Sequence, residues 1–281
     1  MRIEENARVV DFVVQETLLA RVGQNVANFE VLLEDEVFDL WAERMAIRSA
    51  MAGKQFDLVG EKVKAYRLEN AGRHKLHEQF CLYYEMKLAE WRGEEPESIC
   101  RIAEKALSFT KEKDEQPQIR DCLYTPMEVD LLLTLIQYQY GEWKNPWKRE
   151  SCLLKMLEYV ETYFNLERQE DIEGRAWLEL LRLKSGYGDS EMLFPFIDRA
   201  IACFASGSGI LRLAEVRFMK AKLLFKCSRN VEDREAKLRQ CREECKMVYD
   251  IYDVMECEVQ RREVEKFCEE ELQWHITMQM K

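Results

Sequence analysis

The sequence predicts an all-α fold, arranged as an α-solenoid of helical hairpins, on three observations. The chain of 281 residues contains only 11 Gly and 5 Pro, whereas residues that favour helices are plentiful. Apolar residues recur at helical spacing along most of the chain, and no run of alternating β-branched residues indicates a strand. Successive helix pairs repeat about every 34–41 residues, which is typical of solenoids. An irregular helical bundle is the alternative architecture.

The predicted helices follow one another, separated by short polar turns. In the first half we expect them at roughly 12–22, 26–33, 36–52, 56–69, 74–92 and from Pro96 to about Phe109. Residues 111–124 form the longest segment without helical periodicity. In the second half we expect helices at roughly 125–140, 146–165, 171–185, 190–206, 210–227, 231–254 and 256–275, with Pro195 delaying the start of its helix.

Two helix starts carry strong signals. The side chain of Thr125 can accept the backbone N–H of Glu128, whose carboxylate can return the bond, and Pro126 suits the first helical position. Asn145 followed by Pro146 repeats the same device. The five helix pairs have the length of tetratricopeptide-like (TPR-like) hairpins, but the consensus of that repeat aligns on none of them, so the repeats are degenerate.

Charge and cysteine usage limit the class of protein. The 42 Lys and Arg against 53 Asp and Glu give a net charge of −11, which is not typical of a nucleic-acid binder. The ten cysteines form no CxxC pair and no Cys/His cluster, so we expect free, mostly buried thiols in a reducing cytoplasm. No signal peptide and no apolar run of membrane length is present.

Catalysis has little support in the sequence. The chain has three His and lacks a Gly-rich phosphate loop, a GxSxG and an HExxH motif. His74 and His77 lie one turn apart at a helix start, where capping or surface roles outweigh metal binding. We therefore expect no enzyme activity, no cofactor and no metal.

Recognition of a peptide is better supported, because the first helix of each solenoid hairpin forms an inner wall. Carboxamide and Arg side chains there can bond a peptide backbone and its C-terminal carboxylate, and Tyr and Met can pack its side chains. The residues that helical spacing places on this wall are Gln79, Tyr83, Met86, Glu128, Leu132, Arg175, Glu179, Arg182 and Met219. Arg212, Glu215 and Lys222 share the face of Met219.

The last two predicted helices form a separate case. Cys241, Cys245, Val248 and Tyr252 make one apolar line, whereas the final helix is highly charged and has a narrow apolar face. Such a helix either caps the solenoid or forms the seam of a homodimer. Both alternatives are retained.

Near the N-terminus, Ile3, Glu4 and Arg8 are followed by Leu18, Leu19, Arg21 and Gly23. These residues at these offsets resemble the last part of a lambda-repressor-like (Xre-type) helix-turn-helix domain. Asn6 departs from the Gly of that family and Val10 from its Pro. The resemblance implies that residues 1–24 are the remnant of a helix-turn-helix domain, that residues 25–281 are the TPR-like repeat domain, and that the DNA-reading helices are missing from this chain.

Three phrases further along are similar to the peptide-responsive Rgg and PlcR type of regulators. They are Leu76-His77-Glu78-Gln79-Phe80, Ala106-Leu107-Ser108-Phe109-Thr110 and Leu123-Tyr124-Thr125-Pro126-Met127-Glu128. The resemblance implies the peptide-sensing and dimerisation region of a bacterial cytoplasmic transcription regulator active in quorum sensing, which contacts DNA only through the missing domain. The alternative is a general TPR-like scaffold for protein–protein interaction without a DNA role.

Overall fold

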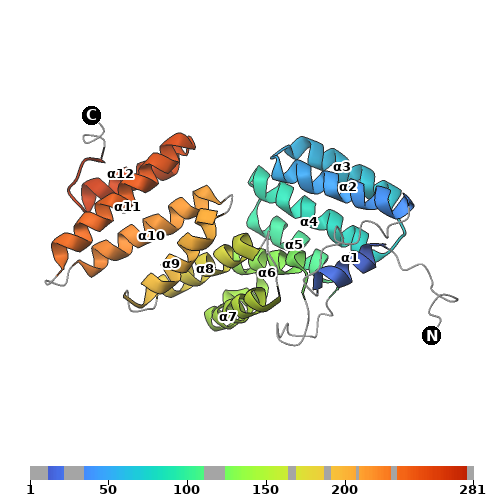
Figure 1. Cartoon of the computed structure of the whole chain (residues 1–281), viewed down its shortest axis with the longest axis horizontal. Coiled ribbons are helices and arrows are strands. Elements are labelled where there is room, and N and C mark those ends of the chain that lie inside the picture. The colour runs from blue at the N-terminus through green and yellow to red at the C-terminus, as the bar shows by residue number, and fades with distance from the viewer. Residues whose placement is uncertain are drawn as a thin grey trace. The chain divides into compact units, whose positions relative to one another are not determined.

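The computed structural model describes residues 12–21, 35–110, 124–163, 169–186, 191–206, 209–228 and 233–276. These residues form twelve α-helices, two short 3-10 helices and no strand (Figure 1), which confirms the all-α prediction. The chain divides into two compact units, unit 1 (residues 1–165) and unit 2 (residues 166–281). The predicted boundary after residue 24 lies outside the described residues, and the helix before it belongs to unit 1.

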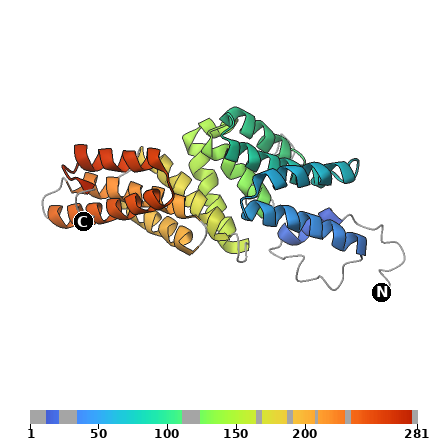
Figure 2. The same ribbon diagram turned by 90° about the horizontal axis from the view of Figure 1, so that it is seen from above.

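The helices of unit 1 begin and end close to the predicted positions. They are α1 (Phe12–Arg21), α2 (Asp35–Ala52), α3 (Phe56–Glu69), α4 (Lys75–Arg92), α5 (Pro96–Leu107), α6 (Pro126–Gln137), the 3-10 helix η2 (Gly141–Lys144) and α7 (Pro146–Tyr163). Figure 2 shows α1 beside α2 in a second view. The predicted helix 26–33 and residues 111–123 lie outside the described residues.

The predicted start signals operate as expected. Thr125 Oγ1 accepts the N–H of Glu128 (3.2 Å), and Glu128 Oε2 accepts the N–H of Thr125 (2.7 Å). Asn145 Oδ1 accepts the N–H of Trp147 (3.0 Å) at the start of α7, and His74 Nδ1 accepts the N–H of Leu76 at the start of α4. Local sequence therefore fixes where these three helices begin.

The end of α6 differs from the prediction. The sequence predicts this helix to about residue 140, but it ends at Gln137 because Gln139 (φ 54°) and Gly141 (φ 56°) adopt left-handed backbone. The backbone N–H of Tyr140 then bonds to Leu135 O (3.0 Å), which closes the helix end. The following 3-10 turn buries Trp143.

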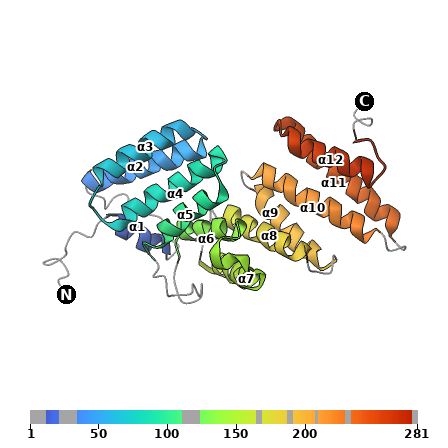
Figure 3. The same cartoon turned by 180° about the vertical axis from the view of Figure 1, so that it is seen from behind.

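Unit 2 also follows the predicted order of helices (Figure 3). Its elements are α8 (Gln169–Ser185), the 3-10 helix η3 (Glu191–Leu193), α9 (Phe194–Ser206), α10 (Ile210–Cys227), α11 (Arg234–Val254) and α12 (Glu258–Glu270). The start of α9 falls at Phe194, directly before Pro195, so the predicted delay is confirmed. Proline fits the first turn of a helix because its missing N–H is not needed there.

Consecutive helices of each unit pack against one another, except that α6 and α7 each contact the 3-10 helix η2 between them. Side chains also join every second helix. In unit 1, the Tyr83 hydroxyl of α4 donates to Asp130 Oδ2 of α6 (2.7 Å). In unit 2, Lys222 of α10 pairs with Glu263 of α12 (2.8 Å). Arg44 of α2 lies over Phe80 of α4, and Arg182 of α8 pairs with Glu215 of α10. The first helices of the hairpins, together with the final helix, therefore form a layer within their own unit, as expected for a solenoid; they are α2, α4 and α6 in unit 1, and α8, α10 and α12 in unit 2.

The C-terminal helices α11 and α12 pack against each other through the apolar line predicted on α11. Cys241, Cys245, Val248 and Tyr252 of α11 are all buried in one core cluster with Val264 and Cys268 of α12. The final helix thus covers α11. By contrast, Val259 at its start is 79% exposed. No helix in the described part of the chain is both long and apolar enough to cross a membrane.

Candidate functional site

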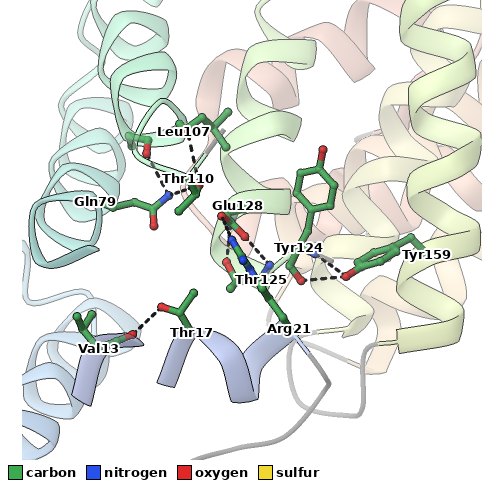
Figure 4. A network of polar contacts seen from close by, with 11 residues as sticks. Val13, Thr17, Arg21, Gln79, Leu107, Thr110, Tyr124, Thr125, Glu128 and Tyr159 are labelled. Carbon is green, nitrogen blue, oxygen red and sulfur yellow. Dashed lines mark hydrogen bonds and ion pairs between the residues drawn. The ribbon is translucent and has the colours of Figure 1, made fainter. Parts of the chain in front are cut away.

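Four of the five predicted wall residues of unit 1 lie in the interior. Gln79, Met86, Glu128 and Leu132 are at most 3% exposed, so the expectation that they line an open groove is wrong. Gln79 Nε2 donates to Ala106 O and to Thr110 Oγ1, both at 3.0 Å, and so ties α4 to the end of α5 (Figure 4). Helical spacing identifies a shared face but cannot tell an open wall from a packed interface.

The fifth residue, Tyr83, is half-buried and belongs to a polar contact between α4 and α6. Its hydroxyl shares Asp130 with Lys87, whose Nζ lies 2.8 Å from the same carboxylate. Glu128 caps α6 and also accepts Arg21 Nη2 of α1 at 3.1 Å (Figure 4). These polar side chains are buried because each has a partner within unit 1.

In unit 2, Arg175 is also buried (5% exposed) and the Glu179 side chain is only 11% exposed, whereas Arg182 reaches the surface. Arg182 pairs with Glu179 and with Glu215 of α10, its Nε donating to Glu215 Oε1 at 3.0 Å. Burial raises the pKa of Glu179, and the positive charge of Arg182 only partly opposes this effect. The guanidinium that we expected to hold a peptide carboxylate is therefore already shared by two carboxylates.

A groove of about 390 Å³ opens along α10 beside the start of α12. Leu211, Arg212, Glu215, Phe218, Met219, Lys222, Tyr252, Cys257, Gln260 and Glu263 line it. Of the predicted site residues, only Met219 lies in this lining. The prediction that Arg212, Glu215 and Lys222 share its face is confirmed. We call this surface the α10–α12 groove.

The floor of the groove is apolar. Phe218 and Tyr252 are each 6% exposed, and Phe218 meets Phe267 of α12 edge to face at 5.6 Å between ring centroids. Burial raises the pKa of Tyr252 to about 12, so its phenol is neutral at physiological pH. Leu211, which is 41% exposed, and the half-buried Met219 extend this apolar surface toward the opening.

The rim carries charges of both signs, each held by a neighbouring helix. Arg212 pairs with Asp171 of α8 at 2.7 Å, and Lys222 pairs with Glu263 at 2.8 Å. The Lys222 Nζ also lies 4.0 Å from the centroid of the Phe218 ring. Since these pairs are exposed, they contribute little stability and can exchange partners at small cost.

The lining residues that the sequence reading missed come mainly from other helices. Leu211 and Phe218 are seven residues apart on the face of Met219, so the same spacing could have found them. Gln260 and Glu263 belong to α12, and spacing within one helix does not reveal which helix lies beside it.

A second hollow, of about 430 Å³, lies in unit 1 at the turn between α2 and α3 and was not predicted. Its lining includes Phe56 and Trp91, whose rings stack at 4.2 Å between centroids. Trp91 is 51% exposed. No predicted site residue lies in this hollow, because the prediction used only helix interiors and these two rings lie at helix ends.

Neither a metal site in the described residues nor a match to a known family assigns a function to this chain. In the described ranges, no group of three or more His, Cys, Asp and Glu side chains is arranged to hold a metal ion. No protein-family model matches the sequence. No curated protein matches it significantly either. Inferences about function therefore depend on the groove and on the sequence features described above.

Proposed function

We propose that this chain is a non-enzymatic recognition module that binds a short segment of a peptide or partner protein in the α10–α12 groove. The proposal depends on the composition of this groove, an apolar floor beneath a rim of paired charges. Segments that dock on helical surfaces bury a few apolar anchors, while polar groups at the edge set orientation. A volume of about 390 Å³ lies within the range of ligand pockets.

A narrower proposal is the peptide-sensing region of a cytoplasmic bacterial transcription regulator. Its support is the resemblance of the N-terminal residues to helix-turn-helix domains and of three phrases in unit 1 to peptide-responsive regulators. A segment bound between α10 and α12 would bias how these helices pack, provided that it binds two packing states with different affinity.

The alternative is a helical-repeat scaffold without a DNA role, which would use the same groove. The two proposals differ in what precedes Met1 in the gene. Codons that complete a helix-turn-helix directly upstream and in frame would favour the regulator. A stop codon, or an unrelated coding sequence, would favour the scaffold.

We also propose a homodimer formed through the last helices. Val254 at the end of α11 and Val259 at the start of α12 are 80% and 79% exposed, and a two-fold contact through these helices would bury them. Light scattering should give a mass of twice 33.5 kDa, and replacing both valines by Lys should give a monomer. A wild-type chain that stays monomeric at tens of micromolar would contradict the dimer.

The groove itself is tested by selecting peptides from a random displayed library against the full chain. We expect that the selected peptides lose at least tenfold in affinity for Met219→Arg, because the new side chain places a charge on the apolar surface that extends from the floor of the groove toward its opening. Met192→Arg is the matched control, since Met192 is 71% exposed in η3 and lies outside the groove lining. Equal loss in both variants, or no loss in either, would contradict the site.

A further inference from the structure

Helix α1 contacts three helices of unit 1 that are first helices of their hairpins. Two of its contacts are to α2 and α4, and the third is the ion pair between Arg21 and Glu128 of α6. Alone, a helix of ten residues is marginal in water. The contacts with α2, α4 and α6 therefore decide whether α1 stays in place.

Glu16 is the acidic residue of α1 that contacts α2, and two arginines of α2 bind its carboxylate. Glu16 is 8% exposed, and its oxygens lie 2.6 Å from Arg44 Nη2 and 2.7 Å from Arg48 Nη2. A carboxylate held by two guanidinium groups is strongly favoured over a solvated one when the arginines are already in position.

Arg44 is positioned by unit 1 independently of α1. Its Nη1 donates to the Tyr66 hydroxyl of α3 at 3.0 Å, and its guanidinium lies 3.8 Å from the centroid of the Phe80 ring of α4. The Tyr66 hydroxyl is in turn hydrogen-bonded to His77 Nδ1 (2.6 Å). This carboxylate site is therefore built by α2, α3 and α4.

At the C-terminal end of α1, Arg21 contacts the carboxylate of Glu128, which is already held in place by its cap of α6. Glu128 is fully buried, and one of its oxygens caps α6 while the other accepts Arg21 (Figure 4). The apolar contact lies at the start of α1, where Phe12 and Val13 are 4% and 0% exposed. Leu18, on the outward side, is 55% exposed.

From these contacts we propose that α1 is a built-in ligand of unit 1. It occupies a helix-binding face which, when α1 leaves, accepts an amphipathic helical segment of a partner. The partner segment carries two adjacent apolar residues, an acidic residue one turn later and a basic residue about one and a half turns after the acidic one. The face offers an apolar socket, an arginine pair and a carboxylate in that order. This site is separate from the α10–α12 groove and does not depend on the function proposed for it.

The test uses the full chain and a fluorescent peptide with the sequence of residues 12–21. Val13→Asp in the chain places a charge in the apolar socket and should displace α1. It leaves every residue of the helix-binding face on α2, α3, α4 and α6 unchanged. Leu18→Asp is the matched control on the exposed side of the same helix. In anisotropy titrations, we expect that the Val13→Asp chain binds the peptide at least tenfold more tightly than the wild type or Leu18→Asp.

The same peptide with Gln in place of Glu16 should bind the Val13→Asp chain about tenfold more weakly, since the arginine pair loses its charged partner. Equal affinity of the peptide for all three chains would overturn the proposal, and so would indifference to the Gln replacement. Circular dichroism is recorded for each chain. If Val13→Asp unfolds unit 1, α1 is an inseparable part of the fold rather than a ligand, and the proposal is also overturned.

Discussion

Units 1 and 2 both have a layer of first helices, but the charged groups under α1 in unit 1 differ in exposure from those at the rim of the α10–α12 groove in unit 2. In unit 1 the charged groups are buried against α1, as in the contact of Glu16 with Arg44 and Arg48. In unit 2 the pairs at the rim of the α10–α12 groove remain exposed, as for Lys222 and Glu263. In unit 1, α1 occupies the face formed by α2, α4 and α6, whereas in unit 2 the α10–α12 groove is open, and we propose that a partner segment binds there.

Two carboxylates, Glu16 and Glu179, show this difference in the direction of their pKa shifts. The side chains of Glu16 and Glu179 are 10% and 11% exposed. Burial on its own raises the pKa of both, but Arg44 and Arg48 together lower that of Glu16 below its ordinary value. Arg182 and Arg175 do not achieve this for Glu179, whose pKa stays raised, because Arg182 is shared with Glu215, whose negative charge also raises the pKa. The direction of the pKa shift therefore follows whether the arginines serve one carboxylate or are shared with a second.

The largest effect is expected from breaking the buried cluster of unit 1. Arg44→Ala removes a partner of Glu16 and of Tyr66 at a site that is 2% exposed, so we expect a loss of about 3–5 kcal/mol in the free energy of unfolding. Arg262→Ala, whose ion pair on α12 is exposed, should cost about 0–1 kcal/mol. Urea denaturation of both variants checks this, and similar losses would remove the contrast between the units.

The pH dependence of stability should have opposite signs in the two units. Because the pKa of Glu16 is lowered from 4.5, its stabilising contribution is complete above pH 4.5 and is lost as the pH falls through the lowered value. Because the pKa of Glu179 is raised from 4.5, its ionised form is disfavoured in the folded state, and stability is lost as the pH rises through the raised value.

Denaturation of the wild type, Glu16→Gln and Glu179→Gln across this pH range separates the two effects. On acidification below pH 4.5, the advantage of the wild type over Glu16→Gln should shrink. The stability of the wild type relative to Glu179→Gln should improve as the pH falls toward and below the same value. Parallel slopes for the two variants would show that the two carboxylates are not distinguished by their arginines.

Sequence patterns predicted the helices well because their signals are local. The capping box of Thr125 and Glu128 and the cap at Asn145 depend on residues within one turn, and both formed as expected. The end of α6 was misplaced because Gln139 adopts left-handed backbone, which any sequence reading assigns first to Gly.

The site was predicted less well because it depends on contacts between helices. Spacing grouped Arg212, Glu215, Met219 and Lys222 correctly on one face, but it could not show that Gln79 turns toward α5 or that Glu128 receives Arg21. Polar residues were assumed to face solvent. In unit 1 they are buried, because partners distant in sequence satisfy their hydrogen bonds.

A smaller effect is expected at the capping box. Thr125→Ala leaves the N–H of Glu128 without its acceptor and should cost about 0.5–2 kcal/mol, measured by thermal or urea unfolding. Thr125→Ser keeps the hydroxyl and should recover most of the loss. If the Ser variant is as unstable as the Ala variant, the hydroxyl bond is not what stabilises the start of α6.

The smallest effect is expected at the rim of the groove. Glu215→Ala breaks one of the two carboxylate contacts of Arg182 at a pair whose side chains are 38% and 36% exposed, so the free energy of unfolding should change by about 0–1 kcal/mol. Its effect on peptide affinity should be larger than its effect on stability. A clear loss of stability would mean that the rim is structural rather than available for a partner.

The central claim, that unit 2 carries the open recognition surface, is tested most directly by hydrogen exchange of the full chain with and without a selected peptide. We expect slower exchange in α10 and at the start of α12, and no change in α2, α4 and α6, because α1 already covers those helices. Slower exchange confined to unit 1, with α10 and α12 unchanged, would contradict the account.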